Sequence, residues 1–253
     1  MSIFFNSAAG RRMIDGEHLV PEFIGRVVLN PTPIVANDGA ESDYRSHRYS
    51  GALPATNGRA YMVFWTLPVS SADIWWWPQN QFGFAGSELS LTGVVAFFAE
   101  STPAPPQLPV GYVFSLSPVE ISSAPMAIRL WNSARELVFD SGRRHLAVQQ
   151  VVAGLGVAYT ATTLPLSGLP STPAFLVPSI YRDQESYTRL APQAHFVEWL
   201  ACYRRTAAGL VSRMVKVNDF MTAPAQALSY SEDETYGNTS GLVLPIIDAT
   251  LYD

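Results

Sequence analysis

The sequence has almost no lysine or cysteine and no long apolar run. Lys216 is the only lysine and Cys202 the only cysteine among 253 residues, so no intramolecular disulfide can form. No apolar stretch reaches the roughly 20 residues of a membrane-spanning helix. The N-terminus also lacks a basic region followed by an apolar run, so we expect no signal peptide. These absences predict a protein that is made in a cytoplasm, stays soluble and does not insert into a membrane.

Charge is also scarce. Charged residues make up 15% of the chain, hydrophobic residues make up 48%, and the formal net charge is −5. This balance argues against disorder and, without a basic patch, against nucleic-acid binding. Arginine carries nearly all the positive charge, as is common at protein interfaces, although GC-rich codon usage would give the same bias. The composition suits a protein that buries surface both in its own core and in an assembly.

Motifs for catalysis and for metal or cofactor binding are missing. There is no phosphate-binding glycine loop, no metal-ligand spacing of Cys and His, and no nucleophile elbow. The four histidines are scattered, and the closely spaced carboxylates lie in polar stretches that would not raise a pKa. Cys202 has apolar neighbours, which predicts a buried, inert thiol. We therefore expect no catalytic residue, no metal and no cofactor, and predict that the protein is not an enzyme.

What the sequence does contain is strand periodicity and turn residues. In residues 126–142 the apolar side chains of Ile128 and Leu130 alternate with others, a polar turn follows, and Leu137–Phe139 returns as a second strand. Apolar runs bounded by Gly and Pro recur along the chain. The fold class predicted is all-β, with one or two antiparallel β-sandwich units and a C-terminal arm.

The hairpin at 126–142 has a counterpart at residues 2–16. The likeness predicts that both form hairpins at equivalent places in two related β units. We place these units at residues 1–100 and 101–253, with a single domain as the alternative. Ile3 matches Ile128, and Asp15-Gly16 matches Asp140-Ser141. Between them, Asn6-Ser7-Ala8 matches Asn132-Ser133-Ala134 after a one-residue gap.

This repeated hairpin resembles one found in a family of small tail-tip and fibre-associated structural proteins of tailed bacteriophages. In that family an apolar strand, an Asn-x-x-Gly turn and a strand ending in Phe-Asp-Ser open the protein and recur in its second half. Here the likeness covers about a sixth of the chain, and Arg135 stands where a Gly is expected.

The resemblance implies a virion protein of the tail that acts in tail assembly or host-receptor adsorption. It implies other phage tail proteins as partners, with a host receptor or glycan as a further one. The chain would be a homo-oligomer, with a trimer favoured, or part of a hetero-assembly.

Three consecutive tryptophans predict a contact surface. On a strand, Trp75, Trp76 and Trp77 cannot all face one side, and an aromatic loop with Phe82 and Phe84 follows. A flat indole face can bind a sugar or a protein, so we expect at least one well-exposed Trp. Packing of two rings in the core is the other reading. The surface also suggests an alternative function, a carbohydrate-binding module or a tail-associated glycan depolymerase.

Two further elements follow in the second half. Residues 195–204 and 209–217 predict an antiparallel strand pair, with a helix over 195–204 as the alternative. An apolar arm, residues 241–253, follows an acidic joint at 232–238 that we read as flexible. We expect the arm to add a strand to a sheet edge, favouring a neighbouring subunit's. Its assembly residues are Leu242, Leu244, Ile246, Ile247, Leu251 and Tyr252.

Overall fold

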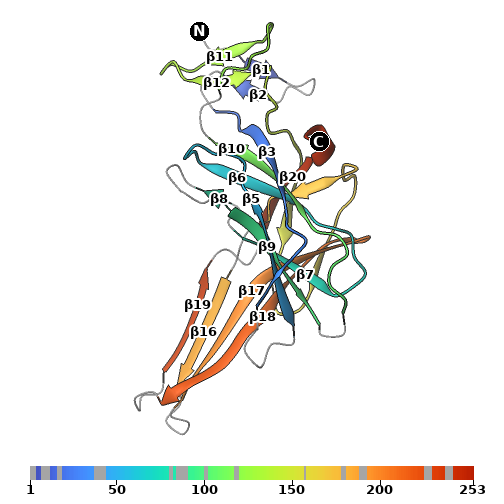
Figure 1. Ribbon diagram of the computed structural model, residues 1–253, viewed down its shortest axis with the longest axis vertical. Helices are drawn as coiled ribbons and strands as arrows, with labels where there is room; N and C mark the ends of the chain where they lie inside the picture. Colours follow the sequence, from blue (N-terminus) through green and yellow to red (C-terminus); the bar gives the residue numbers. More distant parts are fainter. Residues whose placement is uncertain are drawn as a thin grey trace.

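The protein is an antiparallel β-sandwich with additions at both ends (Figure 1). The computed structural model describes residues 4–6, 12–15, 19–36, 44–79, 82–83, 91–99, 102–116, 120–156, 158–177, 181–187, 193–224, 230–236 and 242–253. The only helical element among them is a short 3-10 turn, η1 (Ala249–Leu251). The predicted all-β fold class is confirmed.

One large sheet has the strand order β13–β20–β15–β6–β10–β3, with the short β8 paired to β6. Its centre is the apolar, β-branched and aromatic run at 61–66, which is buried on both faces. Its strands are β3 (Glu22–Val28), β6 (Tyr61–Thr66), β8 (Phe82–Gly83), β10 (Val110–Ser115), β13 (Val148–Leu155), β15 (Pro173–Phe175) and β20 (Leu242–Asp248).

The second large sheet has the order β14–β18–β17–β7–β9–β5–β4. Two more strands, β16 and β19, extend it beyond the sandwich. Its strands are β4 (Ile34–Ala36), β5 (Arg45–Ala52), β7 (Ile74–Gln79), β9 (Leu91–Phe98), β14 (Thr162–Pro165), β16 (Tyr181–Tyr187), β17 (Gln193–Thr206), β18 (Gly209–Pro224) and β19 (Tyr230–Tyr236).

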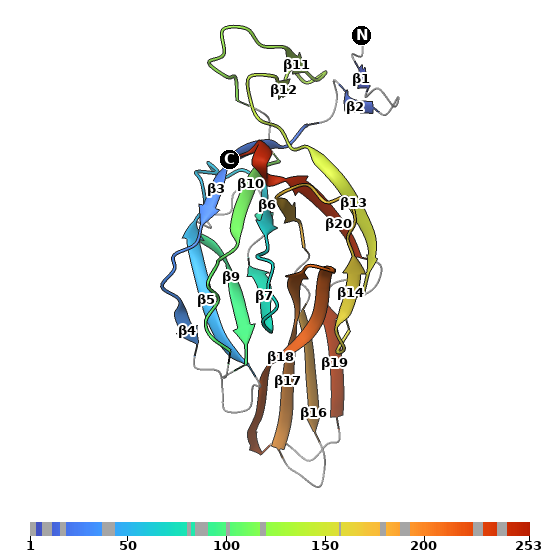
Figure 2. The same ribbon diagram turned by 90° about the vertical axis from the view of Figure 1, so that its right-hand side faces the viewer.

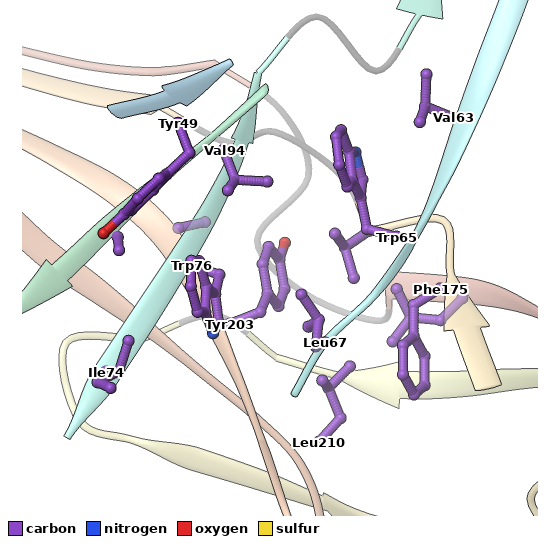
Figure 3. Packing of buried hydrophobic residues seen from close by; sticks show 14 of the residues in the cluster. Tyr49, Val63, Trp65, Leu67, Ile74, Trp76, Val94, Phe175, Tyr203 and Leu210 are labelled. Atoms are coloured by element: carbon purple, nitrogen blue, oxygen red, sulfur yellow. The ribbon is translucent and has the colours of Figure 1, made fainter. Parts of the chain in front are cut away.

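The main core lies between the two sheets (Figure 3). Trp65 of β6 and Ile246 of β20 come from the first sheet, and Trp76 of β7 and Tyr203 of β17 come from the second. All four side chains are buried. Each sheet contains strands from both halves of the chain, so the proposed boundary near residue 100 does not separate the sheets. The division into two units, residues 1–100 and 101–253, stays a prediction.

The strands β17 and β18 form one long hairpin that extends below the sandwich (Figures 1 and 2). Their register runs from Gln193↔Pro224 to Thr206↔Gly209, with Ala207 and Ala208 in the turn. The predicted strand pair is therefore confirmed, and the alternative helix over 195–204 is not formed. A strand fits this segment because its residues alternate between two faces of the sheet. Ala201 and Tyr203 belong to one buried cluster, and Leu200 and Cys202 belong to another.

The projecting hairpin carries β16 and β19 beside it, in the order β18–β17–β16–β19. The expectation of a flexible acidic joint at 232–238 was wrong for residues 232–236, because Tyr230–Tyr236 is a strand. Its register places Asp183 directly opposite both Glu234 and Glu198. Like charges at opposed positions disfavour pairing, so the sequence signal pointed away from a strand here.

The C-terminal arm lies inside its own sheet, so the preference for a neighbouring subunit was wrong. β20 pairs with β13 on one side and with β15 on the other. Backbone pairing along both edges adds to burial of the apolar side chains, and together they retain the strand in its own subunit. The side chains of Leu242, Leu244, Ile246, Ile247 and Tyr252 are buried, whereas Leu251 is half exposed.

Candidate functional site: the hairpin end

Two small hairpins lie at one end of the molecule, outside both large sheets (Figures 1 and 2). One consists of β1 (Phe4–Asn6) and β2 (Arg12–Asp15), the other of β11 (Arg129–Trp131) and β12 (Leu137–Asp140). Both predicted hairpins are thus formed. Both lie at the same end of the molecule, and their assignment to two related β units stays a prediction.

The two hairpins have the same register. Phe4↔Asp15 matches Arg129↔Asp140, the next pairs also correspond, and each hairpin has a bulge after its second pair. Equivalent strand residues therefore differ by 125 throughout. The predicted one-residue gap is wrong, because Asn6 corresponds to Trp131 rather than to Asn132.

This register explains the unusual Arg135. Arg135 has a left-handed backbone, with φ of 63°. The sequence offset of 125 matches Arg135 to Gly10, and glycine is the residue type that adopts a left-handed backbone without steric cost. Asn132 holds the turn closed, since its side-chain Oδ1 accepts a hydrogen bond of 2.9 Å from the Glu136 N–H. The Asn in the sequence pattern thus has a structural role in the turn.

We call the second hairpin and the segments bonded to it, residues 120–146, the hairpin end. Asp140 lies at its centre. Its carboxylate is fully buried and accepts hydrogen bonds from the backbone N–H groups of Ser122 and Gly142, each at 2.8 Å. The Ser122 hydroxyl donates at 3.0 Å and Arg129 Nε at 3.0 Å. Arg129 also donates to the carbonyl oxygens of Ser122 and Ala124. One carboxylate therefore joins the 120–124 segment, both strands of the hairpin and the turn after it.

The charge of Asp140 is stabilised by these donors. Burial alone would raise the pKa of its carboxyl group, but the hydrogen bonds from Ser122, Gly142 and Arg129 outweigh burial. They hold the pKa of Asp140 well below its usual range. A buried carboxylate with four donors is satisfied as an anion, so Asp140 is suited to holding structure rather than to donating a proton.

Further contacts attach the hairpin end to the sandwich. The Phe23 N–H donates to the Arg144 carbonyl at 2.7 Å, and the Leu146 N–H donates to the Pro21 carbonyl at 2.8 Å. Arg143 lies 3.3 Å from the buried Glu22 carboxylate at the start of β3. These bonds orient the hairpin end relative to β3.

Apolar side chains are exposed on this anchored end. Met126 is 90% exposed, and Ile121, Ile128 and Trp131 are each at least half exposed. All four lie within residues 121–131, in or beside the segment that Asp140 and Arg129 hold. Large apolar side chains gathered on one exposed segment are typical of a protein-binding surface. The hairpin end therefore combines a hydrogen-bonded anchor with several exposed apolar side chains.

The predicted surface around Trp75–Trp77 is not open. Trp75 and Trp76 are each 1% exposed and face opposite sides of the second sheet, while Trp77 is half-buried. The expectation of a well-exposed Trp was wrong, and the other reading, in which two rings pack in the core, is confirmed. The reason is that β7 lies between β17 and β9 and both of its faces are covered. The side chain of Phe82 and all of Phe84 lie outside the described residues.

Trp75 packs on the outer face of that sheet under charged groups. The guanidinium carbon of Arg204 lies 4.7 Å from the centre of its ring, and that of Arg213 lies 5.5 Å away. Its Nε1 donates to Asp73 at 2.7 Å, and Arg204 also donates to Asp73, at 2.9 Å. These contacts satisfy and cover the ring, so they serve packing rather than recognition.

Other potential sites are limited in the part of the chain that the structure describes. Cys202 is buried as predicted, and burial raises the pKa of its thiol despite the nearby positive charge of Arg213. Among the described residues, no group of three or more His, Cys, Asp or Glu side chains could hold a metal ion. The same residues contain no helix long and apolar enough to cross a bilayer.

Sequence reasoning identified the hairpin but missed its contact residues. Met126 and Trp131 lie among other apolar residues of the segment 125–131, and periodicity treats such residues as ordinary strand positions. No local signal in the sequence marks them as exposed. No family model, curated protein or solved structure matches this chain.

Proposed function

We propose that the protein is a structural component of a bacteriophage tail-tip or tail-fibre apparatus. It would act in tail assembly or host-receptor adsorption through protein contacts, with glycan contacts as a further mode. The observation that supports the proposal best is the hairpin end, where exposed Met126, Ile128 and Trp131 lie on a segment anchored by buried Asp140. A rigid apolar surface loses little conformational entropy on binding, which suits permanent assembly.

Location and partners follow from the same proposal. The protein would reside in the tail of the virion after synthesis in the host cytoplasm, next to other tail proteins and in more than one copy. The resemblance of the repeated hairpin supports this, and the matching register of the two hairpins supports the internal repeat on which the resemblance rests.

The alternative, a carbohydrate-binding module or glycan depolymerase, rested on Trp75–Trp77. Trp75 and Trp76 are buried and Trp77 is half-buried, so these rings do not form the open aromatic platform that sugar stacking needs. This observation makes the alternative the weaker proposal.

The test is to purify particles of the phage that encodes the chain and to look for the protein in them. We expect mass spectrometry to find it at a constant number of copies per particle, and immunogold labelling to place it at the distal tail. A protein abundant in the infected-cell lysate but absent from washed particles would overturn the proposal. Binding of the isolated protein on a glycan array would instead favour the alternative.

A further inference from the structure

The strand β13 forms one edge of the first large sheet. It pairs only with β20 in the sheet order. Among the described residues, no backbone hydrogen bond from another segment reaches Val148–Leu155. Backbone N–H and C=O groups along such an edge are available to pair with another strand.

Two other edge strands, β3 and β19, are protected in ways that β13 is not. At β3, the backbone of residues 144–146 covers part of the outer side through its bonds with Pro21 and Phe23. The edge strand β19 contains three consecutive carboxylates, Glu232, Asp233 and Glu234. The eight residues of β13 contain no charged side chain and no proline. Charge and proline are the usual means by which proteins prevent edge pairing, so β13 is an edge left open.

The middle of β13 has a regular register and an apolar outer face. Bulges lie on either side, between Val148 and Gln150 and between Ala153 and Leu155, which leaves 150–153 as the regular stretch. Val151 is 59% exposed and stands beside Pro245 of β20, while Val152 pairs with buried Leu244. The next outer pair, Ala153 with Val243, is also exposed. The open edge is thus flanked by exposed apolar side chains on one face only.

We propose that a second copy of this chain pairs with β13, edge to edge and antiparallel, to form a two-fold dimer. Residues directly opposite in such a pair must share a face. Outward residues therefore oppose outward ones, which requires the two-fold axis to pass through a residue position. In the regular stretch this residue is Val151 or Val152, and it lies opposite its own copy. The two sheets then continue across the dimer, and the exposed Val151 side chains of both copies approach each other on the outer face.

A second copy fits this edge because the strand is uncharged. A strand carrying carboxylates would oppose them to identical carboxylates in a symmetric pair, which is unfavourable, and β13 avoids this. The copies carry a net charge of −5 each, so a self-contact needs a surface free of acidic groups. Two-fold pairing of one patch with itself is also the commonest form of homo-oligomer. The inference predicts an even number of copies, in place of the trimer favoured by resemblance.

The symmetry makes a single-cysteine test possible. Cys202 is buried, so a cysteine placed on β13 would be the accessible thiol of the two. In the dimer, either Val151→Cys or Val152→Cys lies opposite its own copy at a separation that a disulfide can bridge. Val28→Cys is the matched control, because Val28 is 70% exposed on β3, the other edge strand of the same sheet.

We expect one of the two β13 variants to form a covalent dimer under mild oxidation at least about tenfold faster than Val28→Cys, because pairing raises the local thiol concentration. In sedimentation equilibrium we expect the wild-type protein and the Val28→Lys variant to be dimers. We expect the Val151→Lys variant to be a monomer. The inference is overturned if both β13 variants cross-link no faster than the control and if the wild-type protein sediments as a monomer. Neither result depends on whether the protein is found in phage particles.

Discussion

Two arginine–aspartate pairs in this molecule have nearly the same length but very different surroundings. Arg129 lies 3.0 Å from Asp140 at the hairpin end, and Arg204 lies 2.9 Å from Asp73 on the second sheet. The Asp140 side chain is 0% exposed, whereas that of Asp73 is 44% exposed. Water solvates the second carboxylate and screens its charge, so the same contact geometry contributes much less there.

The two carboxylates also differ in what they connect. Asp140 accepts hydrogen bonds from Ser122, Arg129 and Gly142, which belong to separate segments of the hairpin end. Asp73 binds groups that packing already positions, including the Nε1 of fully buried Trp75. From this comparison we predict that the structure around Asp140 depends on its carboxylate, whereas the surface around Asp73 forms without that carboxylate.

The largest effect is expected from Asp140→Asn. The asparagine keeps the size of the side chain but loses the charge, and its NH2 group would point at groups that donate hydrogen bonds. Removing one partner of a buried charge pair costs roughly 3–5 kcal/mol. We expect hydrogen–deuterium exchange to show loss of protection in β11 and β12, with β6 as the internal control. Unchanged protection in both strands would show that Asp140 does not hold the hairpin end.

Acid should reveal the same carboxylate. A pKa depressed in the folded state means that Asp140 contributes stability above its unfolded value, 3.8, and that this contribution is lost as the pH falls below that value. The loss is up to about 1.4 kcal/mol per pH unit for one proton. We expect the indole N–H signal of Trp131 to report opening of the hairpin as the pH falls from 5 to 2, because the stabilisation by the Asp140 carboxylate is lost over this range. The Asp140→Asn protein should show no such pH dependence, and an identical titration in both proteins would contradict the account.

A smaller effect, in the opposite direction, is expected from Arg135→Gly. The left-handed backbone of Arg135 costs about 1–2 kcal/mol, and glycine removes this cost while adding roughly 0.5–1 kcal/mol of unfolded-state entropy. The hairpin should become more stable by about 0.5–1 kcal/mol, measured as slower amide exchange in β12. Arg135→Ala is the control, since alanine keeps the steric cost. Equal exchange in the glycine and alanine variants would argue against the backbone explanation.

The smallest effect belongs to Asp73→Asn. An exposed ion pair contributes about 0.2–1 kcal/mol, so the free energy of unfolding should fall by no more than that. Chemical denaturation followed by Trp fluorescence gives this value. A loss as large as that of Asp140→Asn would mean that burial does not distinguish the two pairs.

The sequence predicted the strands better than their arrangement. Runs such as 61–66 and 209–217 show clear strand patterns, because side-chain periodicity is a local property. The sequence left exposure and core packing of Trp75–Trp77 both open, since the outcome depends on which strands flank β7 in the sheet. The pairing of β20 within its own subunit and the strand at 230–236 also depend on pairing partners far away in the sequence. Pairing of this kind leaves no local signal.

The candidate site was predicted in part. The Asn-Ser and Phe-Asp-Ser pattern indicated a repeated hairpin, and the structure gives Asn132 and Asp140 of this pattern a physical role. The exposure of Met126 and Trp131 was not predictable, because it depends on the hairpin lying outside both large sheets.

The most direct test of the central claim is to weaken the apolar surface of the hairpin end without disturbing its anchor. A triple variant, Met126→Ser, Ile128→Ser and Trp131→Ser, can be supplied to phage that lack the wild-type gene. The matched control replaces Val28, Ile34 and Val69, which are exposed apolar residues away from the hairpin end and from the β13 edge, with serine. We expect the hairpin-end variant to fold but to be missing from purified particles, while the control is incorporated. Normal incorporation of the hairpin-end variant would contradict the claim.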